Sequence, residues 1–119
     1  MRDSAWEEVE MDIQDDAVRL KIYVGESDRC GNEPAYKAVV HFLREKGVWG
    51  ASVTRGVYGY GKRNLYHATS PLRLSEDLPM LIETVDSRKK ILPLIPALSD
   101  MIKGGLITLE DVKILRHIG

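Results

Sequence analysis

The chain has 119 residues, 44% of them hydrophobic, which suits a single globular domain that removes roughly two-thirds of its unfolded surface from water. The lone Cys30 excludes an intramolecular disulfide, and no stretch has the layout of a signal peptide or the ~18 apolar residues of a membrane helix. A soluble cytoplasmic protein without membrane insertion is therefore expected.

The charge is unevenly distributed along the sequence. Residues 1–16 hold seven acidic side chains against Arg2 as the one base, a net of −6, and the whole chain carries −1, so the remaining residues carry +5. We predict an acidic N-terminal tail over 1–16 and a folded domain over 17–118. A mildly basic body suits a small anion better than a long nucleic-acid track, and no nucleic-acid partner is expected.

The domain is predicted to open with a strand and a helix. Residues 17–24 alternate apolar and polar side chains, and this period of two is typical of a strand. In the helix that follows, Asn32 is the expected N-cap, Pro34 lies in the first turn and Gly47 marks the end. The apolar face of this helix is formed by Tyr36, Val39, Val40 and Leu43.

The middle of the chain contains two further strands. The sequence "GASVTRGVYGYG" at 50–61 predicts a strand that ends in glycines, and residues 62–77 show no periodicity. Residues 78–85, "LPMLIETV", predict a strand that is apolar enough to be central in a sheet.

A second helix and a last strand complete the domain. The helix is expected to begin near Ser87 and to stop at Gly104 and Gly105, with Pro93 and Pro96 distorting its first half. Its apolar stripe consists of Ile91, Leu94, Ile95, Leu98, Met101 and Ile102. A short extended piece at 106–109 and a strand at 112–118 follow.

The order strand–helix–strand–strand–helix–strand predicts an α+β protein. It is the order of the ferredoxin-like βαββαβ fold, an antiparallel sheet with two helices on one face. No internal repeat beyond that pseudo-duplication is visible.

Catalytic and metal-binding arrangements are not favoured by the sequence. His41, His67 and His117 are scattered, with no carboxylate or cysteine at ligand spacing, so no metal is expected. Cys30 has no nearby histidine partner, and the pair at 76–77, "ED", is expected to shape a turn or to take a salt bridge. The interpretation is a protein without catalytic activity.

The segment "RGVYGYGKRN" at 55–64 is the strongest candidate for a binding site. It matches neither the Walker loop nor the dinucleotide fingerprint. Glycines at 59 and 61 nevertheless allow backbone amides to approach an anion, and Lys62 and Arg63 supply charge. The alternative is a glycine bulge at a strand end. An RNA-recognition module is a third interpretation, but its aromatic motif belongs on the third strand, and here the motif follows the second.

Four stretches carry a resemblance to a known family: "YVGESDRCGNEPAYKAVV", "GASVTRGVYGYG", "RLSEDLPMLIETVDS" and "GGLITLEDVKI". In order and with few gaps, from Ala17 to Ile118, they resemble the PII-like proteins of the domain of unknown function 190. The resemblance implies a ferredoxin-like subunit in a homotrimer, akin to the PII nitrogen-signalling proteins. Those relatives bind adenine nucleotides in clefts between neighbouring subunits.

The resemblance also implies the residues of a nucleotide site. Ala51 and Ser52 lie in "GASV", which is similar to the PII motif Gly-Met-Thr-Val, and the run Gly59, Tyr60, Gly61 and Lys62 is similar to Gly-Phe-Gly-Arg at the base of the PII T-loop. The PII B-loop corresponds to Lys103, Gly104 and Gly105, and Arg116 lies near an arginine that reaches across from the next PII subunit. The lysine with which PII grips the outer phosphates is missing here, so the resemblance favours AMP or ADP over ATP.

Several hypotheses about function remain after this comparison. The first is a nucleotide-sensing or regulatory homotrimer whose segment 62–77 engages an unidentified protein target. The second is an acylphosphatase-like phosphate-ester enzyme, which needs a phosphate-cradling loop after the first strand, where Glu26 and Asp28 would repel the anion. A metal-handling trimer of similar fold and a purely structural trimer are the others. For the nucleotide site, we expect the two glycine segments to leave adjacent strand ends.

Overall fold

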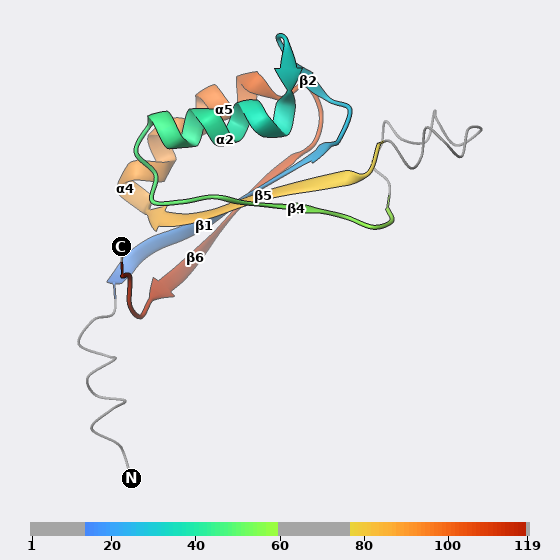
Figure 1. Cartoon of the computed structure of the whole chain (residues 1–119). Helices are drawn as coiled ribbons and strands as arrows, with labels where there is room; N and C mark the ends of the chain where they lie inside the picture. The colour runs from blue at the N-terminus through green and yellow to red at the C-terminus, as the bar shows by residue number, and fades with distance from the viewer. Residues whose placement is uncertain (1–13, 60–76, 119) are drawn as a thin grey trace.

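The computed structural model describes residues 14–59 and 77–118 (Figure 1). Within these residues the strands are β1 (Gln14–Gly25), β2 (Arg29–Cys30), β3 (Glu33–Pro34), β4 (Ser52–Arg55), β5 (Pro79–Ser87) and β6 (Leu106–Ile114). The helical segments are α2 (Ala35–Glu45), α4 (Arg88–Ile91), the 3₁₀ turn η2 (Leu92–Leu94) and α5 (Ile95–Met101).

The described strands form one antiparallel sheet of four in the order β4-β5-β1-β6, with β2 and β3 as a separate hairpin. β1 and β5 are central, and β4 and β6 are the two edges. This is the strand order expected of a βαββαβ chain, and the prediction that residues 78–85 form a central strand is confirmed.

The helices α2 and α5 lie in one layer on the same face of the sheet, as Figure 1 shows. Alternate residues of β1 and β5 point into the space beneath them, because side chains alternate between the faces of a strand. Burying this apolar surface is the main source of stability. The buried core consists of Val18, Leu20, Ile22, Val24, Val39, Leu43, Val48, Met80, Ile82, Ile91 and Leu98. Among the described helices, none combines the length and apolar character that a membrane crossing needs.

The two ends of α2 differ in how well they were predicted. At its end, Gly47 has φ +79°, its N–H donates to the Arg44 carbonyl at 3.1 Å, and the Val48 N–H donates to the Leu43 carbonyl at 3.1 Å. This is a Schellman ending, so Gly47 was predicted correctly. The N-cap prediction was wrong: Pro34 is the N-cap, because Glu33–Pro34 pairs with Arg29–Cys30 and leaves Asn32 in the hairpin turn.

The second helix is distorted at the prolines, as predicted. Ser87 is the N-cap, and its hydroxyl accepts a hydrogen bond from the Lys90 N–H at 3.3 Å. The chain then tightens into η2 around Pro93, since proline has no N–H for a helical hydrogen bond. The helix ends earlier than expected, at Met101, because Ile102 already has extended backbone with ψ 135°.

The strand boundaries differ from the sequence predictions, by one or two residues at each end of β5 and by more in the other three strands of the sheet. β1 begins at Gln14, so the last residues of the predicted tail belong to the sheet. β4 covers only Ser52–Arg55 of the range 50–61. β6 is one continuous strand that ends at Ile114, because β1 offers it a partner from Tyr23 back to Gln14, and residues 115–118 lie beyond it.

The face of the sheet opposite the helices carries a charged cluster. Arg19 Nε lies 3.2 Å from Glu83 Oε2, and Arg19 Nη1 lies 3.4 Å from Glu110 Oε1. Lys21 Nζ lies 3.7 Å from the same Glu110 oxygen. These side chains join β5, β1 and β6 across the open face, where partial exposure to water limits each pair to at most about 1 kcal/mol.

Replacement of Leu98 by alanine should reduce the free energy of unfolding by about 2–5 kcal/mol, since Leu98 is fully buried and its truncation leaves a cavity. Leu92→Ala is the matched control, because Leu92 is 41% exposed and should cost less than about 1 kcal/mol. Urea unfolding of both variants at one protein concentration is the measurement. Equal losses would contradict the described core.

Candidate functional site

The structure divides the predicted site residues into two groups. Tyr60, Gly61 and Lys62 lie outside the described residues. We call the residues near Pro79 the start group, since β5 starts there, and those near Asp86 the end group. The start group is Gly59, Lys103, Gly104 and Gly105, and the end group is Ala51, Ser52 and Arg116.

In the start group, the segment after β4 continues beside the beginning of β5. The Gly56 N–H donates to the Pro79 carbonyl at 2.7 Å. Gly59 has φ +154°, and a Cβ at this position would lie 3.3 Å from Pro79 Cγ. The glycines allow this close approach to the proline ring.

Gly105 approaches β1 even more closely. Its φ is +128°, and a Cβ would lie 2.1 Å from the Tyr23 carbonyl oxygen, which no side chain can do. Both this glycine and Gly59 are thus required by the packing of the chain itself, and their presence alone does not identify a ligand.

The expectation that the two glycine segments leave adjacent strand ends was wrong. They leave β4 and precede β6, which are opposite edges of the sheet. They converge nevertheless, because Gly59 lies against Pro79 of β5 and Gly105 against Tyr23 of β1, and these central strands are neighbours. The two segments therefore flank the same end of the sheet.

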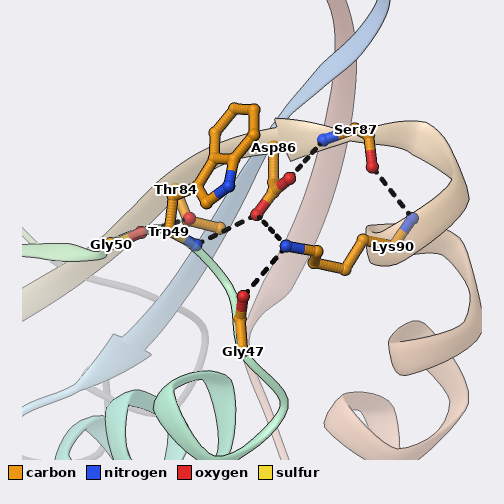
Figure 2. A network of polar contacts seen from close by, with 7 residues as sticks. All are labelled: Gly47, Trp49, Gly50, Thr84, Asp86, Ser87 and Lys90. Atoms are coloured by element: carbon orange, nitrogen blue, oxygen red, sulfur yellow. Dashed lines mark hydrogen bonds and ion pairs between the residues drawn. The ribbon is translucent and has the colours of Figure 1, made fainter. Parts of the chain in front are cut away.

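The end group depends on Asp86, whose side chain is fully buried and lies at the centre of Figure 2. Its Oδ2 accepts a hydrogen bond from the Trp49 N–H at 3.0 Å and lies 3.3 Å from Lys90 Nζ. Its Oδ1 accepts from the Ser87 N–H at 2.6 Å. Lys90 Nζ also donates to the Gly47 carbonyl at 2.9 Å, so one ion pair spans the loop that leads into β4.

A second buried polar residue holds the same loop. The Thr84 hydroxyl donates to the Gly50 carbonyl (Figure 2). Ala51 and Ser52 directly follow Gly50, so Thr84 and Asp86 together fix the entry to β4 and the position of both predicted residues.

Arg116 is placed in the end group by a contact of the next residue, His117. The His117 ring stacks on the Trp49 ring with 4.2 Å between centroids and 22° between planes. Arg116 precedes His117 and is exposed to solvent. The segment 115–118 therefore lies beside the loop that carries Ala51 and Ser52.

Arg88 joins β1 and β6 near the end group. Its Nε lies 3.1 Å from Asp16 Oδ1, and its Nη2 pairs with Asp111 Oδ1. The hydrogen bond to Asp111, followed by that to Asp16, raises the pKa of the Arg88 guanidinium, which is charged at every physiological pH. This contact connects β1, β6 and α4 just before the C-terminal segment begins.

The two groups are far apart in a single chain. β6 runs for nine residues, Leu106–Ile114, between Gly105 and the segment that holds Arg116. At about 3.3 Å per residue, this strand separates them by roughly 30 Å. One chain does not bring all the predicted residues together.

The loop after β1 has no free donors for a phosphate. Each N–H of residues 25–28 has an acceptor within the chain, at 2.8–3.2 Å. The acceptors are the carboxylates of Asp28 and Asp77 and the carbonyls of Leu78 and Gly25. Two carboxylates already fill the place that an acylphosphatase-like enzyme would need for its substrate anion. Asp77 shapes this turn, as the sequence predicted for the pair at 76–77.

The other candidate residues show no catalytic arrangement among the described parts of the chain. His41 lies on the surface of α2, with Nδ1 3.2 Å from Glu33 Oε1, and Cys30 lies in the β2–β3 hairpin. Within residues 14–59 and 77–118, no three His, Cys, Asp or Glu side chains gather to hold a metal ion. His67 lies outside these residues.

Thr84, Asp86 and Trp49 are not among the residues that the sequence predicted for the site. A signal for the first two was present, because they follow Met80 and Ile82 at alternate positions of an otherwise buried strand face. Polar residues at such positions must find partners, since burial without a hydrogen bond is costly. The contact of Trp49 with His117 joins distant parts of the sequence and left no local signal.

Comparisons with known proteins agree with this arrangement of elements. The model of the DUF190 family, described as "Uncharacterized ACR, COG1993", matches residues 17–114. A UPF0166 protein of Methanocaldococcus jannaschii is 38% identical over 98 residues, which cover 82% of this chain and 90% of that protein. A UPF0166 protein of Aquifex aeolicus is 34% identical over 99 residues, or 81% of this chain and 90% of the relative.

A solved structure shares the fold at low identity. It is CPII from Thiomonas intermedia, a nitrogen regulatory PII-like protein whose structure is bound to ADP, AMP and bicarbonate. The TM-score is 0.54 at 17% identity, and the match covers 86% of this chain and 96% of CPII.

Replacement of Asp86 by asparagine should lower the free energy of unfolding by about 2–4 kcal/mol, since hydrogen bonds to a charged group contribute about 1.5–3 kcal/mol and an amide nitrogen would face a donor. Asp100→Asn, at an exposed position of α5, is the control and should change it by less than about 0.5 kcal/mol. Urea unfolding at fixed protein concentration compares them. Coinciding unfolding curves would show that the Asp86 carboxylate does not hold the loop.

Proposed function

The chain belongs to the DUF190 family, and from this membership we propose that it is a PII-like regulatory protein that binds an adenine nucleotide and has no catalytic activity. In the proposal it acts in the cytoplasm as a homotrimer. AMP and ADP are the favoured ligands, and no metal is required.

The observation that carries the proposal is the separation of the start group from the end group. Residues that the resemblance assigns to one nucleotide lie at opposite ends of β6 in a single chain, roughly 30 Å apart by strand length. A cleft between two subunits, with the start group from one chain and the end group from its neighbour, brings them together. A closed ring of such head-to-tail contacts gives identical sites.

The residues of both groups suit the phosphate of a nucleotide. Backbone amides around Gly59 and Gly104–Gly105 would face the anion, and Lys62 and Arg116 would add charge-assisted hydrogen bonds of roughly 1.5–3 kcal/mol each. The lysine for outer phosphates is missing, which favours a short nucleotide. The binding of ADP and AMP by CPII supports this class of ligand.

The open face of the sheet supports the homotrimer. The helices cover one face only, and the other carries Tyr23 and Leu81 beside the charged cluster of Arg19, Glu83 and Glu110. Burial of this face between subunits would remove its apolar side chains from water. The segment 62–77 is proposed to engage a protein target.

An acylphosphatase-like enzyme is the second candidate, since it shares the strand order. The occupied amides of residues 25–28 argue against it, because no donor of this loop remains for the substrate. The nucleotide-binding function is therefore better supported.

Titration calorimetry with AMP, ADP and ATP tests the ligand. AMP should bind at least as tightly as ATP. Gly61→Val should prevent binding by blocking approach of the backbone, and Lys62→Ala should weaken it by about tenfold or more. Lys37→Ala, at an exposed position of α2, is the charge-matched control and should bind as wild type does. Unchanged affinity of Gly61→Val would place the phosphate elsewhere.

Light scattering on the purified chain tests the assembly. The expected mass is three times the chain mass of 13.4 kDa at micromolar concentration. A monomeric mass would rule out a site shared between subunits, because neither group could then be completed.

A further inference from the structure

We propose that the stack of His117 on Trp49 is a positioning device that holds Arg116 toward the nucleotide of the neighbouring subunit. This inference rests on the proposed function, which assigns no role to His117 or Trp49. His117 and Trp49 act through Arg116 and are not themselves assigned a contact with the ligand.

The segment that carries Arg116 needs an anchor. The ladder between β6 and β1 ends at Ile114, and residues 115–118 have no regular secondary structure. Leu115 is 42% exposed and Ile118 is 77% exposed, so neither fixes the segment by burial. The ring of His117 makes the segment's aromatic contact among the described residues, at 4.2 Å from Trp49.

Trp49 is itself well fixed, although its side chain is 42% exposed. Its N–H donates to the buried Asp86 carboxylate at 3.0 Å, and Lys90 Nζ lies 5.4 Å from its ring centroid (Figure 2). Lys90 is held in turn by Asp86 and by the Gly47 carbonyl. The backbone of Trp49 is therefore held by Asp86, Lys90 lies near the indole, and His117 stacks on the ring.

The stack has a consequence for the adjacent residue. With His117 held on the indole, the backbone of Arg116 is fixed one residue away, and fewer orientations of the guanidinium remain to be lost when a ligand binds. Without the stack, Arg116 belongs to a segment beyond the paired part of β6, where ordering must accompany binding. The loop that contains Trp49 leads through Ala51 into β4 at Ser52, so the stack also keeps the end group together.

The test measures AMP affinity by titration calorimetry in wild type and four variants: His117→Ala, His117→Phe, Arg116→Ala and the double variant His117→Ala/Arg116→Ala. His117→Ala should weaken binding about three- to tenfold, a part of the loss of about tenfold or more expected for Arg116→Ala. His117→Phe should restore affinity to within about twofold of wild type, because a phenyl ring can stack in the same place. The double variant should bind no more weakly than Arg116→Ala alone.

Trp49 fluorescence provides a second measurement that needs no ligand. In a Trp6→Phe background, which leaves Trp49 as the only indole, His117→Ala should shift or increase the emission, since the ring that covers the indole is removed. Unchanged emission would mean that the stack does not form in solution, and this would overturn the inference.

The binding results separate this inference from the proposed function. Equal affinity of His117→Ala and wild type would overturn the positioning role alone. A further loss when His117→Ala is added to Arg116→Ala would also overturn it, because His117 would then act independently of Arg116. Absence of AMP and ADP binding by wild type would overturn both.

Discussion

The length of β6 is the constraint on which the account depends. The strand pairs with β1 from Tyr23 to Gln14, with one register shift between Ala17 and Gln14, and this pairing keeps it extended over nine residues. It thereby holds the turn at Gly105 and the segment 115–118 at opposite ends of the sheet. No rearrangement of side chains can close a separation of roughly 30 Å. In the proposed homotrimer, a complete site therefore needs the start group of one chain and the end group of its neighbour.

Each end of the sheet is built by a different kind of interaction. At the start of β5, glycines allow the backbone to approach Pro79 and Tyr23 without a side chain in between. At the end of β5, the buried Asp86 carboxylate satisfies donors of Trp49, Ser87 and Lys90. A buried charge is stable only with such partners, and the partners are held in place in return. The first end depends on glycines, which have no side chain, and the second depends on the polar network of Asp86.

The sequence predicted the features that depend on local patterns. Alternation revealed the strands, and the Schellman ending at Gly47 and the distortion at Pro93 follow from the conformational preferences of glycine and proline. The failures have physical reasons. Asn32 is not the N-cap, because the hairpin of β2 and β3 places Pro34 at the start of the helix. The two pieces predicted from residue 106 onward form the single strand β6, because the residues on both sides of the predicted break pair with β1. The division of the site into two groups depends on strand order and length, which no short motif records.

Complementation between two defective chains tests the composite site most directly. Gly61→Val is proposed to block the phosphate position beside the start group, and Arg116→Ala removes the guanidinium of the end group, so each variant alone should bind AMP poorly. After the two are unfolded together and refolded in equal amounts, about a quarter of the sites should pair the intact start group of one variant with the intact end group of the other. Calorimetry should then show AMP binding with wild-type affinity at roughly that stoichiometry, and folded trimers mixed without exchange should not show it. If the co-refolded trimers regain no tight site, both groups act within one chain or neither binds the nucleotide, and the account is contradicted.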